Sequence, residues 1–397
     1  MPDETEGLRI ASERIAREVE ERTGSLDLGG LGLRSWPEEF RAPKPSEALS
    51  ALRSLECREN PLTTLEPLAR LTSLQSLKCW CNDLTTLEPL RGLTSLRLLE
   101  CGGNELTSLE PLAGLTSLRE LDCAENRLTT LEPLRGLTAL QFLRCCDNPL
   151  TTLEPLAELL SLQSLYCSRS ELTTLEGLEG HASLRLLDCQ RNGITTLKAL
   201  EGCISLERLD CFFNRLTSLE PLAGLASLHF LQCSNNKLTT LEPLAVLTSL
   251  NDLECASNWL TTLEPLARLP SLRRLNCAYN RLTTLEGLTG ITSLRALFCH
   301  QNQLTTLEGL AGIVSLEFLQ CGANRITTLE PLTELPVLRE LLCSDNPLEK
   351  LPEKLVRRES LRKLVLPETP FDGIPAEALS LHGDNCLERL RAHFRQR

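Results

Sequence analysis

Leucine and cysteine recur along this chain with a period of 22 residues. Residues 52–348 follow the pattern LxxLxCxxNxLTTLEPLxxLTS fourteen times without an insertion. In one copy, Leu77 and Cys79 alternate with Ser76 and Lys78, and this period of two is typical of a short strand with one buried face. The pattern therefore predicts one strand per repeat, with the leucine and cysteine side chains pointing inward.

The other leucines of each copy predict the turns that complete a coil. Leu84, Leu87, Leu90 and Leu93 are expected to point inward. The proline of each LEPL segment, such as Pro67, suits the first turn of a short helical or 3₁₀ piece. Neighbouring strands would pair in parallel about 4.8 Å apart. Because each coil buries its apolar face against the next, a single repeat is not expected to be stable alone.

The cysteines follow the same period. Of 18 cysteines, fourteen stand at 22-residue intervals from Cys57 to Cys343. A cysteine that recurs once per structural unit indicates a core ladder of reduced thiols, which favours a cytoplasmic protein over a secreted, disulfide-bonded one. We expect these thiols to be inert, whereas Cys81 and Cys146 should face outward and react. Because Cys145 and its neighbour Cys146 should point to opposite faces, metal chelation by cysteine is not expected.

An asparagine follows each strand in all copies but one. It recurs at 22-residue intervals from Asn60 to Asn346, with Ser170 as the single departure. A side-chain amide can donate and accept, so it can satisfy backbone groups that turn inward after the strand. We expect a structural role for this asparagine and an incomplete replacement by the hydroxyl of Ser170.

The unit closely resembles leucine-rich repeats of the 22-residue type, as in internalins and the phosphatase-regulating class, with cysteine in place of the second strand leucine. This resemblance implies an α/β repeat fold: a right-handed solenoid, horseshoe or arc, with a parallel sheet on the concave face and short helical or 3₁₀ turns on the convex face. It places fourteen repeats in residues 49–348, a helical cap with a divergent first coil in residues 1–48, and a last divergent coil with a cap helix in residues 349–397.

The N-terminal end predicts a capping helix over Glu6–Arg22, with Leu8, Ala11, Ile15 and Val19 on one face. An irregular loop is expected over residues 35–48.

The C-terminal end predicts a last strand within residues 361–366 and a helix over residues 384–397. Both ends are similar to the leucine-rich-repeat segments of bacterial Roco-type signalling proteins, in which GTPase or other effector domains often follow. The sequence contains no GxxxxGK[ST] motif, so no nucleotide-binding role transfers with this similarity.

Charge and motifs narrow the function classes. The net charge of −12 disfavours nucleic acid and anionic membranes as partners, because both require clustered Lys and Arg. There is no HExxH, no GxSxG and no apolar run of about 18 residues. The recurring glutamate before proline is present at 12 of 13 positions, with Lys198 as the exception; we interpret it as a helix-start residue and not as a calcium site. We therefore expect no catalysis, no metal and no cofactor.

Sequence variation is concentrated at the outward positions of the strands. Nine of the fourteen aromatic residues fall there: Trp80, Phe142, Tyr166, Phe212, Phe213, Phe230, Tyr279, Phe298 and Phe318. Large rigid side chains on an exposed sheet are typical binding anchors. The patch we favour has Phe212, Phe213 and Phe230 at its centre, one coil apart, with Arg191 and Arg208 beside them.

Two other interpretations of these aromatics stay open. They could cover strand backbone and pack on one another. They could also reflect duplication, because Phe142, Phe230 and Phe318 are 88 residues apart.

The sequence thus favours a non-enzymatic interaction module that binds a protein or peptide on its concave face. The alternatives are a sensor or regulatory fragment of a Roco-like multidomain protein, and a purely structural solenoid.

Overall fold

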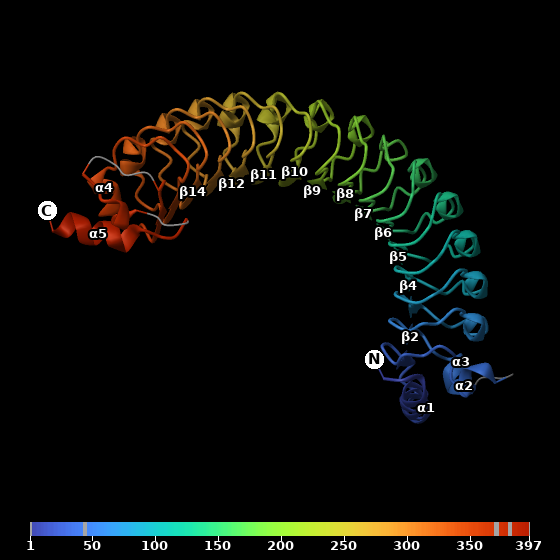
Figure 1. Ribbon diagram of the computed structural model, residues 1–397. Coiled ribbons are helices and arrows are strands. Elements are labelled where there is room, and N and C mark those ends of the chain that lie inside the picture. Colours follow the sequence, from blue (N-terminus) through green and yellow to red (C-terminus); the bar gives the residue numbers. More distant parts are fainter. Residues whose placement is uncertain (1, 43–45, 369–372, 380–382, 397) are drawn as a thin grey trace. The chain divides into compact units, whose positions relative to one another are not determined.

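The computed structural model describes residues 2–42, 46–368, 373–379 and 383–396. Each of two compact units is a stack of coils (Figure 1). The units consist of Met1–Ile194 with Lys198–Leu206, and of Thr195–Leu197 with Glu207–Arg397.

Every described coil contributes one three-residue strand, as the alternation of leucine, cysteine and polar residues predicts. The strands of the first unit are β1 (Ser25–Asp27), β2 (Ser54–Glu56), β3 (Ser76–Lys78), β4 (Leu98–Glu100), β5 (Glu120–Asp122), β6 (Phe142–Arg144), β7 (Ser164–Tyr166) and β8 (Leu186–Asp188). Those of the second unit are β9 (Arg208–Asp210), β10 (Phe230–Gln232), β11 (Asp252–Glu254), β12 (Arg274–Asn276), β13 (Ala296–Phe298), β14 (Phe318–Gln320), β15 (Glu340–Leu342) and β16 (Lys363–Val365).

Within each unit the strands pair in parallel with their neighbours in sequence. The register repeats the sequence period, so that Leu77 faces Leu99 in the first unit and Leu231 faces Leu253 in the second. Every ladder of leucine therefore runs straight through the stack. The leucines and the fourteen recurring cysteines are buried, which confirms the predicted inward face of the coil and the core position of these thiols.

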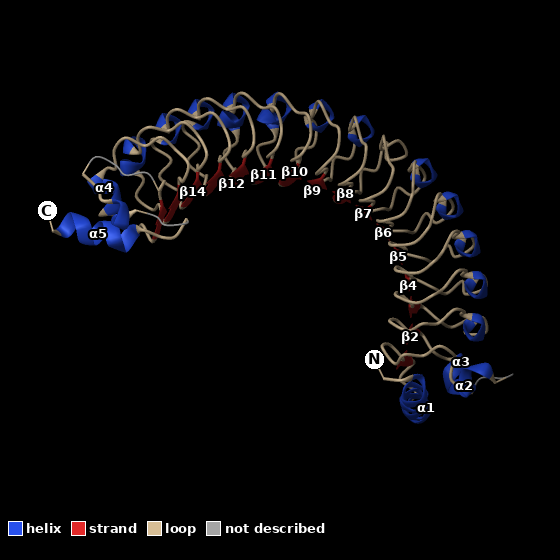
Figure 2. Cartoon of the chain, in the orientation of Figure 1, coloured by secondary structure: helices blue, strands red, loops and turns tan. Residues whose placement is uncertain are grey.

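Short 3₁₀ helices lie on the side of the coils opposite the strands (Figure 2). In the first unit they are η1 (Glu66–Leu68), η2 (Glu88–Leu90), η3 (Glu110–Leu112), η4 (Glu132–Leu134), η5 (Glu154–Leu156) and η6 (Lys198–Leu200). In the second they are η7 (Glu220–Leu222), η8 (Glu242–Val246), η9 (Glu264–Arg268), η10 (Glu286–Leu288), η11 (Glu308–Leu310), η12 (Glu330–Glu334) and η13 (Ala376–Ala378). The predicted helical turn at each LEPL segment is confirmed, with glutamate as its first residue.

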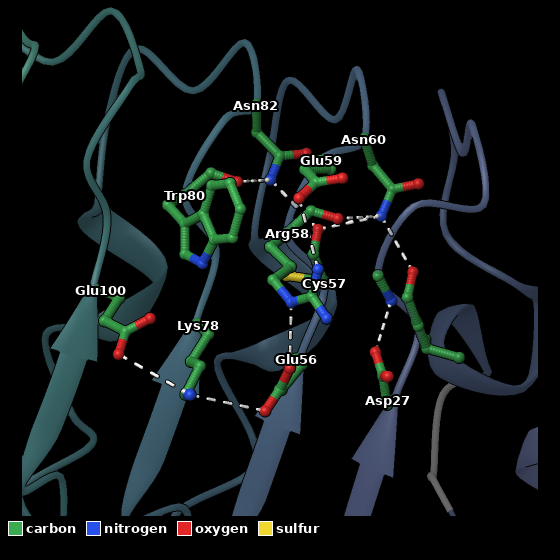
Figure 3. Close-up of polar contacts among 12 residues, drawn as sticks. Asp27, Glu56, Cys57, Arg58, Glu59, Asn60, Lys78, Trp80, Asn82 and Glu100 are labelled. Carbon is green, nitrogen blue, oxygen red and sulfur yellow. Dashed lines mark hydrogen bonds and ion pairs between the residues drawn. The ribbon is translucent and has the colours of Figure 1, made fainter. Parts of the chain in front are cut away.

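The recurring asparagine joins consecutive coils through backbone hydrogen bonds (Figure 3). The side-chain nitrogen of Asn82 donates to the carbonyl of Cys79 in its own coil at 3.0 Å and to the carbonyl of Cys57 in the preceding coil at 3.1 Å. Its side-chain oxygen accepts from the backbone N–H of Leu62 at 3.1 Å. The predicted structural role of asparagine is confirmed, since one amide satisfies three inward-turned backbone groups.

The N-terminal cap is helix α1 (Glu4–Glu21), as predicted, and its packing face agrees with the predicted one in part. Of the predicted residues, Ala11 and Ile15 are buried, Leu8 is partly exposed and Val19 is exposed. Gly7 belongs to the packing face, because a β-carbon there would lie 1.9 Å from the carbonyl oxygen of Leu31 in the first coil. The helix therefore approaches the coil along its smallest residue, and the packing face is shifted from the predicted one.

The predicted irregular loop contains two short helices, α2 (Glu38–Arg41) and α3 (Glu47–Ser50). The hydroxyl of Ser46 caps α3 by accepting from the backbone N–H of Leu49. Residues 43–45 of the predicted loop lie outside the described residues.

The C-terminal end contains helix α4 (Glu353–Val356), strand β16 and helix α5 (Leu387–Arg395). Asn385 continues the inter-coil pattern at this edge, accepting from the N–H of Leu364 at 3.0 Å and donating to the carbonyl of Arg362 at 3.0 Å. The exposed edge of the last strand is thereby hydrogen-bonded before α5 begins.

One sequence prediction about thiols is wrong. Cys146 is buried, with 5% of its surface exposed. Burial raises the pKa of its thiol, which is hydrogen-bonded to Ser168. Cys81 alone is exposed among the 18 cysteines.

Candidate functional site

The outward side chains of the strand segments form one continuous face within each unit. We number these segments by strand position, so that Ser76 is position 1, Leu77 position 2 and Asn82 position 7. Positions 2 and 4 are the buried leucine and cysteine, and position 7 is the buried asparagine or, in one coil, Ser170. We call positions 1, 3, 5 and 6 the strand face. All sequence-predicted site residues lie on it.

In the first unit the structure places the predicted aromatics in two locations. The rings of Phe142 and Tyr166, from neighbouring coils, lie 5.5 Å apart. Trp80 stands at position 5 of an earlier coil, with the guanidinium of Arg58 5.5 Å from its ring. Arg191 is exposed at position 6 of the last strand segment of this unit.

In the second unit the predicted centre at Phe212, Phe213 and Phe230 does not form one cluster. The register pairs Phe230 with Arg208 across β10 and β9, and the Arg208 guanidinium lies 3.5 Å from the centre of the Phe230 ring. Phe212 is four residues further along its strand segment, roughly 13 Å at about 3.3 Å per residue. The rings of Phe212 and Phe213 instead lie 6.0 Å from each other.

In the second unit, four rings meet on three coils that begin with β12, β13 and β14. The rings of Phe298 and Phe318 are 4.8 Å apart, and those of Tyr279 and His300 meet edge to face at 5.3 Å. Phe298 and His300 stand two positions apart in one strand segment, so the two pairs are adjacent. We call these four residues with Arg274 the aromatic patch.

Arg274 fixes one end of the aromatic patch. Its guanidinium lies 4.6 Å from the Phe298 ring centre and 2.7 Å from a carboxylate oxygen of Glu254. Glu254 is almost fully buried and also accepts from the side chain of Asn276 at 2.7 Å. Burial raises the pKa of Glu254, while Asn276 and Arg274 oppose this by stabilising the carboxylate. The cation over the ring is thus held in place by the protein itself.

The opposite end of the aromatic patch is exposed. Tyr279 has 54% of its surface exposed, although its ring packs against His300. Burial lowers the pKa of His300, which favours a neutral imidazole within the patch. Small side chains stand beside the rings at Ala278 and Ala296.

Tyr279 and Phe213 also occupy a demanding backbone position. Strand position 6 is left-handed in every repeat, with φ of 53° at Tyr279 and 54° at Phe213. Bulky residues are uncommon in this region, where glycine or asparagine is less strained. The two most exposed aromatics of the strand face therefore stand at a backbone position that disfavours bulky residues.

Comparisons with known proteins agree with this architecture. The family model described as leucine-rich repeats (2 copies) matches residues 94–136, 182–224, 226–268, 248–290, 270–312 and 292–334. These residues of the chain are leucine-rich repeats. No curated protein sequence matches it.

Solved leucine-rich-repeat structures extend the similarity over most of the chain. A leucine-rich-repeat protein of Leptospira interrogans is 26% identical with a TM-score of 0.85, and the match covers 96% of this chain and 97% of that one. The internalin inlF of Listeria monocytogenes is 25% identical with a TM-score of 0.70, covering 87% and 94%. The functional domain of InlJ from Listeria monocytogenes, which includes a cysteine ladder, is 26% identical with a TM-score of 0.65, covering 83% and 79%.

The leucine-rich-repeat framework explains which site residues the sequence analysis missed. Arg274 and His300 were not selected, although both stand at strand-face positions next to a selected aromatic. Adding 22 residues pairs Phe230 with Arg208. It does not give the partners of Arg274 and His300, because Arg274 lies 24 residues before Phe298 and His300 lies 21 residues after Tyr279. Their contacts run diagonally between neighbouring coils and depend on side-chain reach.

Among the described residues, no group of three or more His, Cys, Asp or Glu is arranged to hold a metal ion. Within the same residues, no helix has the length and apolar character needed to cross a bilayer.

Proposed function

We propose that this leucine-rich-repeat protein is a non-enzymatic binding module whose strand face holds a protein or peptide partner, with the aromatic patch as the centre of contact. The observation that carries this proposal is the adjacency of Phe318, Phe298, His300 and Tyr279 beside a fixed arginine. Extended binding surfaces on the strand side are the usual use of such solenoids.

The chemistry of the aromatic patch matches that of interface hot spots. Tyrosine, tryptophan and arginine are enriched at such positions, because they bury a large area at low conformational cost. Here Arg274 is already paired with Glu254 and stacked on Phe298, so little ordering is left to be done on binding. The partner would bury apolar surface on the two phenylalanines and a polar group near the Tyr279 hydroxyl.

The other predicted anchors extend the proposed surface along each unit. Trp80, Phe142, Tyr166 and Arg191 would contribute from the first unit. Arg208, Phe212, Phe213 and Phe230 would contribute from the second.

The proposal is tested with the triple variant Tyr279→Ala, Phe298→Ala, Phe318→Ala. A partner is first isolated by affinity capture on the full-length chain, and its affinity for each variant is then measured by calorimetry. Truncating one hot-spot aromatic typically costs about 2 kcal/mol or more, about thirtyfold in affinity. We expect at least this loss in the triple variant, with an unchanged melting temperature.

Two controls make the result specific. Val314→Ala removes an equally exposed apolar side chain, 52% exposed, from the turn after η11, and it should leave affinity unchanged. The variant Phe212→Ala, Phe213→Ala, Phe230→Ala tests the centre predicted from sequence. A loss in that variant alone would move the centre there, and wild-type affinity in both triple variants would refute binding at the strand face of the second unit.

A further inference from the structure

A hollow opens on the strand face of the first unit, beside Trp80. It has a volume of about 470 Å³ and is lined by Trp80, Cys81, Glu100, Gly102, Gly103, Asp122, Ala124, Glu125 and Arg144. Its cause lies in one coil, in which strand positions 5 and 6 are both glycine. A β-carbon at Gly103 would lie 3.0 Å from the Cys81 sulfur, so the glycine preserves the space.

The hollow exposes one face of an indole whose other face is already stacked. Arg58, Trp80 and Gly102 occupy position 5 of three consecutive coils. The guanidinium of Arg58 lies 5.5 Å from the Trp80 ring centre. Figure 3 shows the indole with Arg58 on one side and Glu100 on the other. Where the next coil would place a side chain against the second face, Gly102 places none.

The residues that line the hollow carry an excess of negative charge. Its lining contains three carboxylates, at Glu100, Asp122 and Glu125, and one guanidinium, at Arg144, which lies 3.3 Å from Asp122. Glu100 forms an ion pair with the Lys78 ammonium at 3.7 Å, and Glu56 shares that ammonium at 3.6 Å.

Two further observations agree with this negative potential. Glu125 is exposed and forms no ion pair with any other side chain that the structure describes. Burial raises the pKa of Glu100, with Lys78 opposing this rise and Asp122 and Glu56 adding to it. A positive group in the hollow would therefore relieve existing repulsion among the carboxylates.

From this geometry we infer that the hollow beside Trp80 binds an arginine side chain of a protein partner, stacked between the indole and the Gly102–Gly103 backbone and paired with Glu100 and Glu125. The inference rests on the proposed partner-binding function and adds to it a second contact of defined chemistry. A guanidinium is flat, stacks on aromatic rings and donates two parallel hydrogen bonds to a carboxylate. An ammonium is a compact charge that lacks this planar, two-pronged geometry. Arg58 already shows the same stacking on the opposite face of the indole.

The experiment uses a peptide in place of the natural partner. The full chain, labelled with ¹⁵N at its three tryptophans, is titrated with acetyl-Gly-Arg-Gly-amide, and the indole N–H resonances are followed by NMR. Variants Trp36→Phe, Trp80→Phe and Trp259→Phe assign the three signals. We expect a saturable shift of the Trp80 signal alone, since Trp36 is buried and Trp259 lies in the other unit. The lysine peptide should bind several-fold more weakly and the neutral citrulline peptide at least tenfold more weakly.

Matched charge variants locate the contact. Glu125→Gln should weaken the arginine peptide at least threefold. Asp147→Asn removes the carboxylate at the same strand position of the next coil, outside the hollow, and should change binding less than twofold. An unmoved Trp80 signal, an equal response to citrulline, or equal effects of the two variants would overturn the inference.

This titration and the calorimetric test can fail independently. The peptide measurement needs no natural partner, so its failure would leave binding at the aromatic patch in place. Conversely, if the calorimetric test refuted binding at the aromatic patch, a measured arginine site in the first unit would remain.

Discussion

The asparagine at strand position 7 shows how a single side chain holds two coils together. Asn236 donates to the carbonyls of Cys211 at 3.0 Å and Cys233 at 3.1 Å, and accepts from the N–H of Leu216 at 2.9 Å. Because it is buried, removal of the amide leaves those groups without water as a substitute.

We therefore expect Asn236→Ala to lower the free energy of unfolding by about 1–3 kcal/mol. Glu242 begins a 3₁₀ helix on the exposed side of the same coil. Glu242→Ala should change the free energy of unfolding by at most about 0.5 kcal/mol. Urea denaturation of both variants gives the ranking. The opposite order would contradict the assignment of inner and outer positions in the coil.

Thiol accessibility is a second property set at single residues. Cys81 is exposed, whereas the fourteen ladder cysteines and Cys146, Cys203 and Cys386 are buried. Burial together with Glu125 and Glu59 raises the pKa of the Cys81 thiol, so its reaction should be moderate and should accelerate with pH. We expect one thiol per chain to react with a colorimetric disulfide reagent in the native state and 18 after denaturation. Rapid native labelling that persists in Cys81→Ser would show that the ladder is accessible.

The position of Cys146 could not be derived from alternation alone. Strand position 5 follows the strand and precedes a left-handed residue, so its direction is not set by the period of two. Small side chains there, such as Ala124, Cys146 and Ser234, are buried, whereas Trp80 and Phe212 are too large and remain partly exposed. Exposure at this position depends on side-chain size and on neighbouring coils.

At the scale of the structural element, the coil that contains Ser170 interrupts the asparagine ladder. The Ser170 hydroxyl is buried without a hydrogen-bond partner among the described residues. An asparagine at position 170 would accept a hydrogen bond from the N–H of Leu150. In this coil that N–H donates instead to the carbonyl of Asn148 at 2.8 Å. This agrees with the expectation that the hydroxyl of Ser170 replaces the amide incompletely.

Restoring the ladder should stabilise the protein. Ser170→Asn returns the repeat consensus and is expected to raise the free energy of unfolding by about 0.5–2 kcal/mol. Asn82→Ser, the reverse change in a regular coil, serves as its counterpart and should destabilise. Chemical denaturation compares the two. A loss of stability in Ser170→Asn would mean that the coil has adapted its backbone to serine.

The capping helix α1 depends on close contact at one residue. A β-carbon at Gly7 would meet the Leu31 carbonyl oxygen at 1.9 Å, whereas one at Gly92 would meet nothing within 4 Å. We expect Gly7→Ala to cost about 1–3 kcal/mol, because the helix must move away from the first coil. Gly92→Ala is the matched control and should stay within about 0.5 kcal/mol of wild type. Thermal unfolding measures both, and equal melting temperatures would contradict the close packing of α1.

The existence of this helix was predictable from its apolar spacing, and its packing face was predictable in part. Apolar spacing selects Leu8, Ala11, Ile15 and Val19, of which Ala11 and Ile15 are buried. The structure adds Gly7 and Glu18, whose carboxylate accepts at 2.7 Å from the N–H of Gly24. The packing face depends on steric fit to the first coil, and the sequence of the helix alone does not contain that information.

For the molecule as a whole, the strict 22-residue period makes the coil and the strand register predictable, because every copy satisfies the same burial and hydrogen-bond rules. The candidate site follows less directly. Which aromatics contact each other depends on the register and on side-chain reach, as the separation of Phe212 from Phe230 shows. Repetition fixes the framework, and the exceptions to it, such as Gly102 and Gly103, create the hollow.

The same repetition predicts a collective response to alkaline pH. Burial raises the pKa of Cys57, Cys277 and Cys321 from the ordinary value of 9.0 to about 12. A folded-state pKa raised above the unfolded value gives stability that is fully present below pH 9 and is lost as pH rises toward 12, because the unfolded chain releases its thiol protons first. Each such thiol should remove about 1.4 kcal/mol of unfolding free energy per pH unit in that window.

Urea denaturation in reductant, at closely spaced pH values from 8 up to the pH at which the chain unfolds without urea, tests this response. Wild-type stability should change little up to pH 8 and then fall steeply, because the contributions of the ladder thiols add. Cys321→Ala deletes one contributor, so its decline above pH 8 should be shallower than that of wild type, although the variant is less stable at pH 8. Cys81→Ala removes the exposed thiol and should leave the slope nearly unchanged. Equal slopes in wild type and Cys321→Ala would show that the ladder thiols do not couple folding to pH.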